Sequence, residues 1–137
     1  MSEQDSFDVG SLATSEKLET EGVWRDLPKG AKLKVARWGN TQFSRLMRSK
    51  FKGVRDLIEG EDDLADQVSL EVLIEVMAVT ILKDMSGISL GTEKFDKYTP
   101  AIGIRLLQIK DFREKVKALS EQAEKYREAL EDKGVNS

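Results

Sequence analysis

The sequence contains neither histidine nor cysteine among its 137 residues. Histidine is the commonest general base and transition-metal ligand, and the cysteine thiolate is a common nucleophile and metal ligand. Catalysis would therefore have to use carboxylates, lysines or hydroxyl groups. We expect a protein that is not an enzyme and that binds no metal or other cofactor. Because no disulfide can form, nothing in the chain indicates an oxidising compartment.

A long apolar run is also missing. The longest apolar stretch, Val72–Leu82, is interrupted by Glu75 and Thr80 and is shorter than the roughly 20 residues needed to cross a bilayer. The first ten residues are acidic and lack the apolar segment of a secretory signal. With 39% hydrophobic and 34% charged residues, the composition is typical of one soluble domain. We expect a cytoplasmic location.

Opposite charges are concentrated in two adjacent blocks. Residues 31–55 contain eight basic and no acidic side chains, and residues 56–75 contain eight acidic and no basic ones. Such blocks are expected to pair within the molecule or to steer a charged partner. The basic block, with Trp38 and Phe43 nearby, would also suit nucleic acid through phosphate contacts and stacking. Because the chain as a whole is acidic, a protein with an acidic surface is the favoured partner and nucleic acid is the alternative.

The N-terminal part of the chain predicts a β-hairpin. Residues 1–20 are polar and rich in turn-forming residues, and we expect them to form a loosely ordered arm. In the segment 31–38, Leu33 and Val35 alternate with lysines, as in a half-buried strand. A short apolar segment precedes it, and the connector Pro28–Gly30 is typical of a tight turn.

The rest of the chain has helical periodicity. The predicted helices span residues 41–58, 62–85, 99–110 and 111–133. The second is apolar nearly all round, which places it at the centre of a bundle. Thr99-Pro100 marks the start of the third. The predicted fold class is α+β, mainly α, with a short N-terminal β-hairpin followed by a four-helix body. We expect one domain over residues 21–133, preceded by the arm and followed by a tail of residues 134–137.

The last predicted helix carries a heptad stripe. Apolar residues recur at spacings of 4, 3, 4, 3 and 4, at Phe112, Val116, Leu119, Ala123, Tyr126 and Leu130. Such a stripe either packs a terminal helix on its own core or forms a coiled-coil seam for self-association. Because nearly three heptads are short for an independent coiled coil, intramolecular packing is favoured.

Two acidic clusters invite comparison with metal sites. Glu59–Asp63 lacks the alternating ligand spacing of a calcium loop, so we interpret its carboxylates as stabilising a helix N-terminus. Glu71 and Glu75 lie one helical turn apart, but di-metal sites in bundles usually add a histidine. We interpret this pair as a polar stripe that faces the basic block. Neither cluster predicts a metal site.

Several short motifs follow one another in a fixed order over residues 12–128. The first are Leu12-Ala13-Thr14, Glu21-Gly22-Val23-Trp24 and the strand Lys32–Arg37 closing on Gly39-Asn40. The later ones are Ala78–Ile88, Tyr98-Thr99-Pro100, Leu106-Leu107 and Asp111-Phe112-Arg113. In order and spacing they resemble the tail assembly chaperone family of long-tailed, siphovirus-type bacteriophages. The family often has tryptophan at the position of Met85.

The resemblance implies a mixed fold with a few short N-terminal strands and a helical body. It also implies a non-enzymatic protein that binds the tape measure protein and tail tube subunits and keeps them competent for assembly. Such a protein acts in the host cytoplasm and is absent from the mature virion. Two alternatives remain open: a nucleic-acid-binding or regulatory phage protein that uses the basic block, and a structural tail subunit.

The candidate contact surfaces are the basic block, the two tryptophans and the Ser86–Lys97 loop. Alternatively, the tryptophans are core residues and the loop is a connector. The candidate partner-binding residues are Trp24, Arg37, Trp38, Arg45, Arg48, Lys52 and Phe95.

Overall fold

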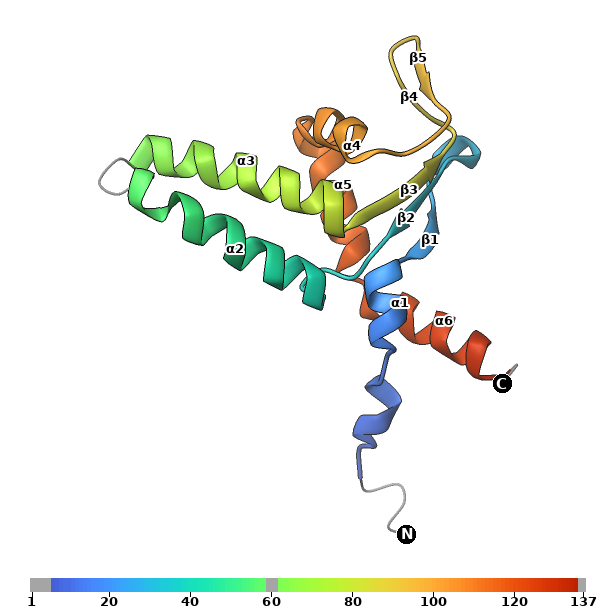
Figure 1. The fold of residues 1–137 in the computed structure, drawn as a ribbon. Helices are drawn as coiled ribbons and strands as arrows, with labels where there is room; N and C mark the ends of the chain where they lie inside the picture. Colours follow the sequence, from blue (N-terminus) through green and yellow to red (C-terminus); the bar gives the residue numbers. More distant parts are fainter. Residues whose placement is uncertain (1–5, 59–61, 136–137) are drawn as a thin grey trace.

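The structure, a computed structural model, describes residues 6–58 and 62–135. These residues form six α-helices, a three-stranded antiparallel sheet and a separate two-stranded hairpin (Figure 1). The predicted class, α+β and mainly α, is confirmed. The predicted four-helix body is wrong, because six helices are present and strands also follow the second long helix. None of the described helices is long and apolar enough to span a membrane.

The helices are α1 (Glu16–Glu21), α2 (Thr41–Ile58), α3 (Asp62–Thr80), α4 (Pro100–Leu107), α5 (Lys110–Ser120) and α6 (Ala123–Val135). The strands are β1 (Val23–Asp26), β2 (Lys32–Val35), β3 (Leu82–Ser86), β4 (Ile88–Leu90) and β5 (Glu93–Phe95). In Figure 1, α2 and α3 form a long helical hairpin that projects from a body made by the larger sheet and the other helices.

The larger sheet joins the predicted hairpin to a strand from the middle of the chain. β1 and β2 pair antiparallel, as predicted, with Val23 opposite Val35. The connector forms a short 3₁₀ turn in which Lys29 adopts a positive φ of 63°. β3 pairs with the other edge of β2 and places Leu33 opposite Met85. Because Leu33 and Val35 are fully buried, this face of the sheet belongs to the core.

The helix α3 ends at Thr80 and does not continue to residue 85 as its apolar pattern predicts. Two carbonyls at its end accept hydrogen bonds from outside the helix. The Thr80 carbonyl accepts from the Asn40 side-chain amide (3.2 Å), and the Ile81 carbonyl accepts from the Ala36 N–H (2.7 Å). With these carbonyls engaged elsewhere, the following residues extend as β3.

The heptad stripe is divided between α5 and α6, so the single helix that its spacing predicts is wrong. The helices are separated at residues 121–122. The Leu119 carbonyl accepts a hydrogen bond from the Arg25 guanidinium (2.9 Å), and the Ser120 carbonyl accepts one from the Trp38 N–H (2.9 Å). These partners from distant parts of the chain satisfy carbonyls at the end of α5 that a continuing helix would use.

The stripe itself packs inside the chain. Val116, Leu119 and Tyr126 are buried. The Tyr126 hydroxyl donates a hydrogen bond to the Val35 carbonyl (2.9 Å) and so ties α6 to the sheet. Burial raises the pKa of the Tyr126 phenol. The nearby Arg25 and Arg37 lower this pKa by a smaller amount, and Glu19 raises it.

The helix α4 lies close against α3. Thr99 caps α4 by accepting a hydrogen bond from the Ile102 N–H (3.3 Å), with proline at the first helical position as predicted. The Tyr98 hydroxyl donates to the Ala78 carbonyl of α3. A Cβ atom at Gly103 would overlap this hydroxyl and lie 3.1 Å from the Ala78 Cβ. Glycine therefore permits the close packing of the two helices.

The expected N-terminal arm is partly ordered. The helix α1 lies within it, carries the buried Leu18 and contacts α6 and α2. Packing against the body therefore begins before residue 21. Only the segment that precedes α1 extends away from the body, below it in Figure 1.

Candidate functional site

The first candidate site is a groove between the first turns of α2 and the last turn of α3. This α2–α3 groove has a volume of about 510 Å³ and is lined by Gln42, Arg45, Leu46, Ser49, Val79 and Thr80. Val79 is 46% exposed, whereas its helical neighbours Val76 and Met77 are fully buried. Leu46 on the facing helix is half-buried. The α2–α3 groove thus leaves a small apolar surface open to solvent.

Positive charge surrounds the α2–α3 groove. Arg45 is exposed at its rim. The Lys83 ammonium donates to the Gln42 side-chain oxygen (3.2 Å) and to the Val79 carbonyl (3.2 Å). Burial and the neighbouring Lys34 lower the pKa of this ammonium. Within the described part of the chain, neither Arg45 nor Lys83 forms an ion pair, so the rim favours an acidic partner.

A basic stripe runs along the exposed side of α2. Arg45, Arg48 and Lys52 are spaced three and four residues apart, lie on one helical face and are exposed. None of them forms an ion pair with another described residue. By contrast, Lys50 pairs with Glu75 of α3 (3.1 Å). That pair confirms the predicted internal pairing between the two charge blocks, whereas the stripe faces solvent.

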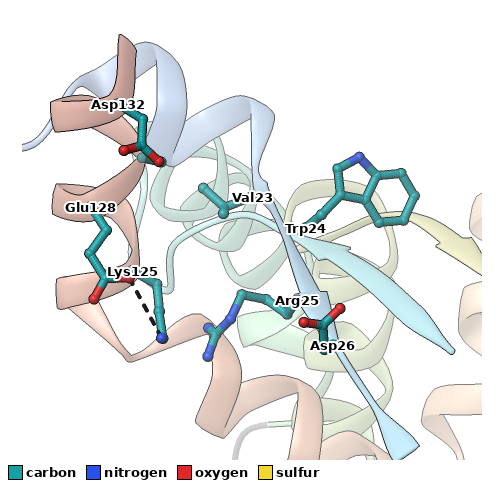
Figure 2. Close-up of a pocket in the computed structure, with 8 residues that line it drawn as sticks. Val23, Trp24, Arg25, Asp26, Lys125, Glu128 and Asp132 are labelled. Atoms are coloured by element: carbon teal, nitrogen blue, oxygen red, sulfur yellow. Dashed lines mark ion pairs between the residues drawn. The ribbon is translucent and has the colours of Figure 1, made fainter. Parts of the chain in front are cut away.

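The second candidate site lies between β1 and α6 (Figure 2). This β1–α6 groove has a volume of about 400 Å³ and is lined by Val23, Trp24, Arg25, Asp26, Lys125, Glu128, Ala129 and Asp132. Figure 2 shows Val23 and Arg25 pointing toward α6, whereas Trp24 points away from it. Lys125 and Glu128 form an ion pair within α6 (3.6 Å). The groove therefore has a mixed charge and no basic rim comparable to that of the α2–α3 groove.

Trp24 stands on the outer face of the sheet. It lies opposite Lys34 of β2 and is 45% exposed. Exposed tryptophans are common anchors in protein interfaces, because they offer a large rigid apolar surface. Of the two tryptophans, Trp24 is thus the one whose ring is open to a partner.

Arg37 and Trp38 are engaged within the chain. Arg37 pairs with Glu19 of α1 (2.8 Å). The Trp38 ring lies 4.7 Å from the Phe43 ring, and the Lys117 ammonium lies 5.3 Å from its centre. Trp38 therefore helps to pack α2 and α5 on the body. This agrees with the second interpretation of the tryptophans, in which they are core residues.

Phe95 is also part of the core. It is buried at the end of β5, and the Arg105 guanidinium lies over its ring at 5.7 Å. Arg105 forms an ion pair with Glu93 (2.7 Å), and its hydrogen bond lowers the pKa of that carboxyl. These contacts attach the β4–β5 hairpin to α4. The ring of Phe95 is not available at the surface.

The acidic clusters have different surroundings. Part of the first, residues 59–61, lies outside the described residues. In the second, Glu75 pairs with Lys50, and Glu71 accepts a hydrogen bond from the Gln67 amide (3.4 Å). Among the described residues, no group of three or more histidine, cysteine, aspartate or glutamate side chains is placed to hold a metal ion.

The structure brings together three of the predicted contact residues, those of the basic stripe, and separates the other four. It also adds residues that the sequence pattern did not single out, chiefly Leu46, Val79 and Lys83. Because α3 is apolar nearly all round, its periodicity gives no signal that Val79 is open to solvent. An isolated apolar residue near the end of such a helix can be assigned to a surface only once the helices are packed.

The fold and its grooves define a small, mainly helical α+β protein with two open surface grooves. A family model described as the YdaY prophage protein matches residues 38–136, which is well over half of the chain. The chain belongs to this prophage protein family and is therefore phage-related. The matched part includes α2 and α3 and thus the whole α2–α3 groove. No curated protein and no solved structure matches the chain.

Proposed function

We propose that the protein is a non-enzymatic phage tail assembly chaperone. It binds the tape measure protein, the tail tube protein or both in the host cytoplasm, keeps them soluble and is left out of the mature virion. Membership in a prophage protein family supports a phage role. The ordered motifs along residues 12–128 support the tail assembly step. The α2–α3 groove carries the proposal, because exposed apolar surface occurs there together with basic side chains that form no ion pair with another described residue.

The physical task of such a chaperone is to cover surfaces that would otherwise aggregate. Tube subunits present strand edges and apolar patches until they polymerise. A shallow groove binds such a patch reversibly, and the basic stripe steers acidic clients toward it. Weak contacts repeated along a long helical tape measure protein give sufficient total affinity while allowing later displacement.

The basic stripe favours a second candidate function. Arg45, Arg48 and Lys52 are spaced and exposed as phosphate-binding residues would be. Nucleic acid bound in this way dissociates steeply as salt rises, since its affinity depends on released counterions. A structural tail subunit is a further alternative, and recovery of the protein from purified virions would favour it.

The test is to co-express the full chain with the tube and tape measure proteins of its own phage. Soluble complexes are recovered at low and at high salt. Val79→Ser removes apolar surface from the groove, and Ile109→Ser is its matched control, because both side chains are 46% exposed. Arg45→Glu reverses the charge of the rim, and Lys110→Glu, at an exposed site on α5, is its control.

We expect a client that precipitates alone to stay soluble with the wild type and with both controls. It should be lost with Val79→Ser and with Arg45→Glu. Retention of nucleic acid in place of either client would contradict the chaperone proposal and favour the second function. Equal loss with the controls would show that the α2–α3 groove is not the binding site.

A further inference from the structure

The segment before α1 exposes three large apolar side chains that its own chain does not cover. Phe7 and Val9 are each 71% exposed, and Leu12 is also exposed. We refer to residues 6–13 as the N-terminal hook. Exposed apolar groups gathered on one short segment are unusual in an isolated chain and are typical of a surface that another molecule covers.

The hook has a defined local shape. Asp8 caps a 3₁₀ turn by accepting a hydrogen bond from the Gly10 N–H (2.9 Å), and its carbonyl accepts from the Ser11 hydroxyl (2.7 Å). A turn of this kind holds Val9 and Leu12 in place before any partner is met. A preorganised segment loses less conformational entropy on binding than a flexible one.

The C-terminal end of the hook is attached to the body. The Thr14 hydroxyl accepts a hydrogen bond from the Arg37 guanidinium (3.4 Å), and Ser15 caps α1. The Thr41 hydroxyl donates to the Glu16 carboxylate (3.1 Å) and fixes the start of α1 beside α2. Figure 1 shows the segment running away from the body, below α1. Because Phe7 and Val9 are each 71% exposed, the segment does not cover the groove of its own chain.

The hook and the α2–α3 groove have complementary charge. Asp8 is the one charged residue within residues 6–13. The groove offers the exposed Val79 together with Arg45 and Lys83, two cations that form no ion pair with another described residue. A volume of about 510 Å³ is large enough for apolar side chains of the hook.

We propose that the hook of one copy of this chain seats in the α2–α3 groove of a second copy. Its apolar side chains cover Val79 and Leu46, and Asp8 faces the basic rim. When two copies exchange hooks, the same contact is made twice around a two-fold axis, as is usual in homodimers. The exchange covers the groove when no client is bound, but it does not depend on what the client is.

The first test measures the mass of the full chain by analytical ultracentrifugation over a wide concentration range. We expect the mass to rise with concentration from 15.4 kDa toward that of a dimer. The double variant Phe7→Ser/Val9→Ser and the single variant Arg45→Glu should each weaken association about tenfold or more. Ile109→Ser and Lys110→Glu should leave it unchanged, because they lie outside the proposed interface.

The second test uses the absence of native cysteine to identify the occupant. A chain with Val9→Cys is mixed with a chain with Ser49→Cys under mild oxidation. Hook exchange predicts a covalent dimer of the two different chains, whereas a Val9→Cys and Lys110→Cys mixture should give little. The chain carrying both Val9→Cys and Ser49→Cys should form no internal disulfide at high dilution.

Three results would overturn the proposal. They are a single-chain mass at every concentration, a dimer that the hook variant leaves intact, and an internal disulfide in the diluted double-cysteine chain. The last result would show that the hook folds into its own groove. Since these measurements contain no client, their failure leaves the chaperone proposal to its own test.

Discussion

The body and the α2–α3 hairpin are held together in different ways. In the body, long-range hydrogen bonds join distant elements: the Tyr126 hydroxyl donates to the Val35 carbonyl, and the Arg25 guanidinium donates to the Leu119 carbonyl. In the hairpin, α3 contributes buried core residues such as Val76 and Met77, whereas Leu46, Met47 and Phe51 of α2 are only half-buried and the Lys50–Glu75 ion pair remains partly exposed. An exposed pair of this kind adds little stability. The body is thus a fixed scaffold, and the hairpin keeps surface that a partner can use.

The largest effect should come from matched leucine truncations in the two regions. Leu33→Ala removes a fully buried side chain from the sheet and should lower the free energy of unfolding by about 3 kcal/mol or more. Leu46→Ala removes a half-buried side chain beside the groove and should cost about 1 kcal/mol. Urea denaturation of both variants measures the difference. Equal losses would mean that the hairpin is packed as tightly as the body.

The contact between α3 and α4 provides the next test. Gly103→Ala places a methyl group against the Tyr98 hydroxyl and should destabilise the fold by about 1–3 kcal/mol. Adding Tyr98→Phe removes the atom that is overlapped, so the double variant should lose less than the sum of the two single losses. Thermal or urea unfolding of all three proteins measures this coupling. Strict additivity would contradict the close approach of the two helices.

Tyr126→Phe should have a smaller effect. It removes the hydrogen bond that ties α6 to β2 and leaves the Val35 carbonyl buried without that donor, at a cost of about 1 kcal/mol. Hydrogen exchange should then speed up in α6 more than in α2. A uniform change in both helices would indicate that this bond does not anchor α6 specifically.

The same tyrosine should make the stability of the fold depend on pH in the alkaline range. Burial raises the pKa of Tyr126 in the folded protein above the value of about 10 expected in the unfolded chain. The folded state therefore retains this proton after the unfolded state has lost it, and stability falls as pH rises above about 10. Tyr98 has the same sign of shift from burial. Urea unfolding from neutral to alkaline pH should show a shallower decline for Tyr126→Phe than for the wild type.

The smallest effect on stability is expected on the basic stripe. Arg48→Ala and Lys52→Ala remove exposed cations without ion pairs among the described residues and should change the free energy of unfolding by less than about 0.5 kcal/mol. If the stripe steers clients, the same variants should slow client binding at low salt and have little effect at high salt. Surface plasmon resonance at two salt concentrations measures both rates. A stability loss as large as that of Tyr126→Phe would place these side chains in the packing.

Much of the fold follows from local sequence signals. The alternation at Leu33 and Val35 predicted β2, and Thr99-Pro100 predicted the start of α4. Two of the misassigned helix ends share a cause. The end of α3 and the bend between α5 and α6 both depend on carbonyls that accept hydrogen bonds from residues far away in the sequence. No periodicity within a helix contains that information.

The candidate site divides in the same way. The sequence alone determined the two charge blocks, and a helix through residues 41–58 was enough to place Arg45, Arg48 and Lys52 on one face. Only the tertiary structure decided that Trp24 is open while Trp38 packs in the body, and that Val79 borders a groove. The physical reason is that burial depends on which elements meet. The spacing of apolar residues along a helix or strand indicates which side of that element is apolar. It does not indicate whether another element covers that side.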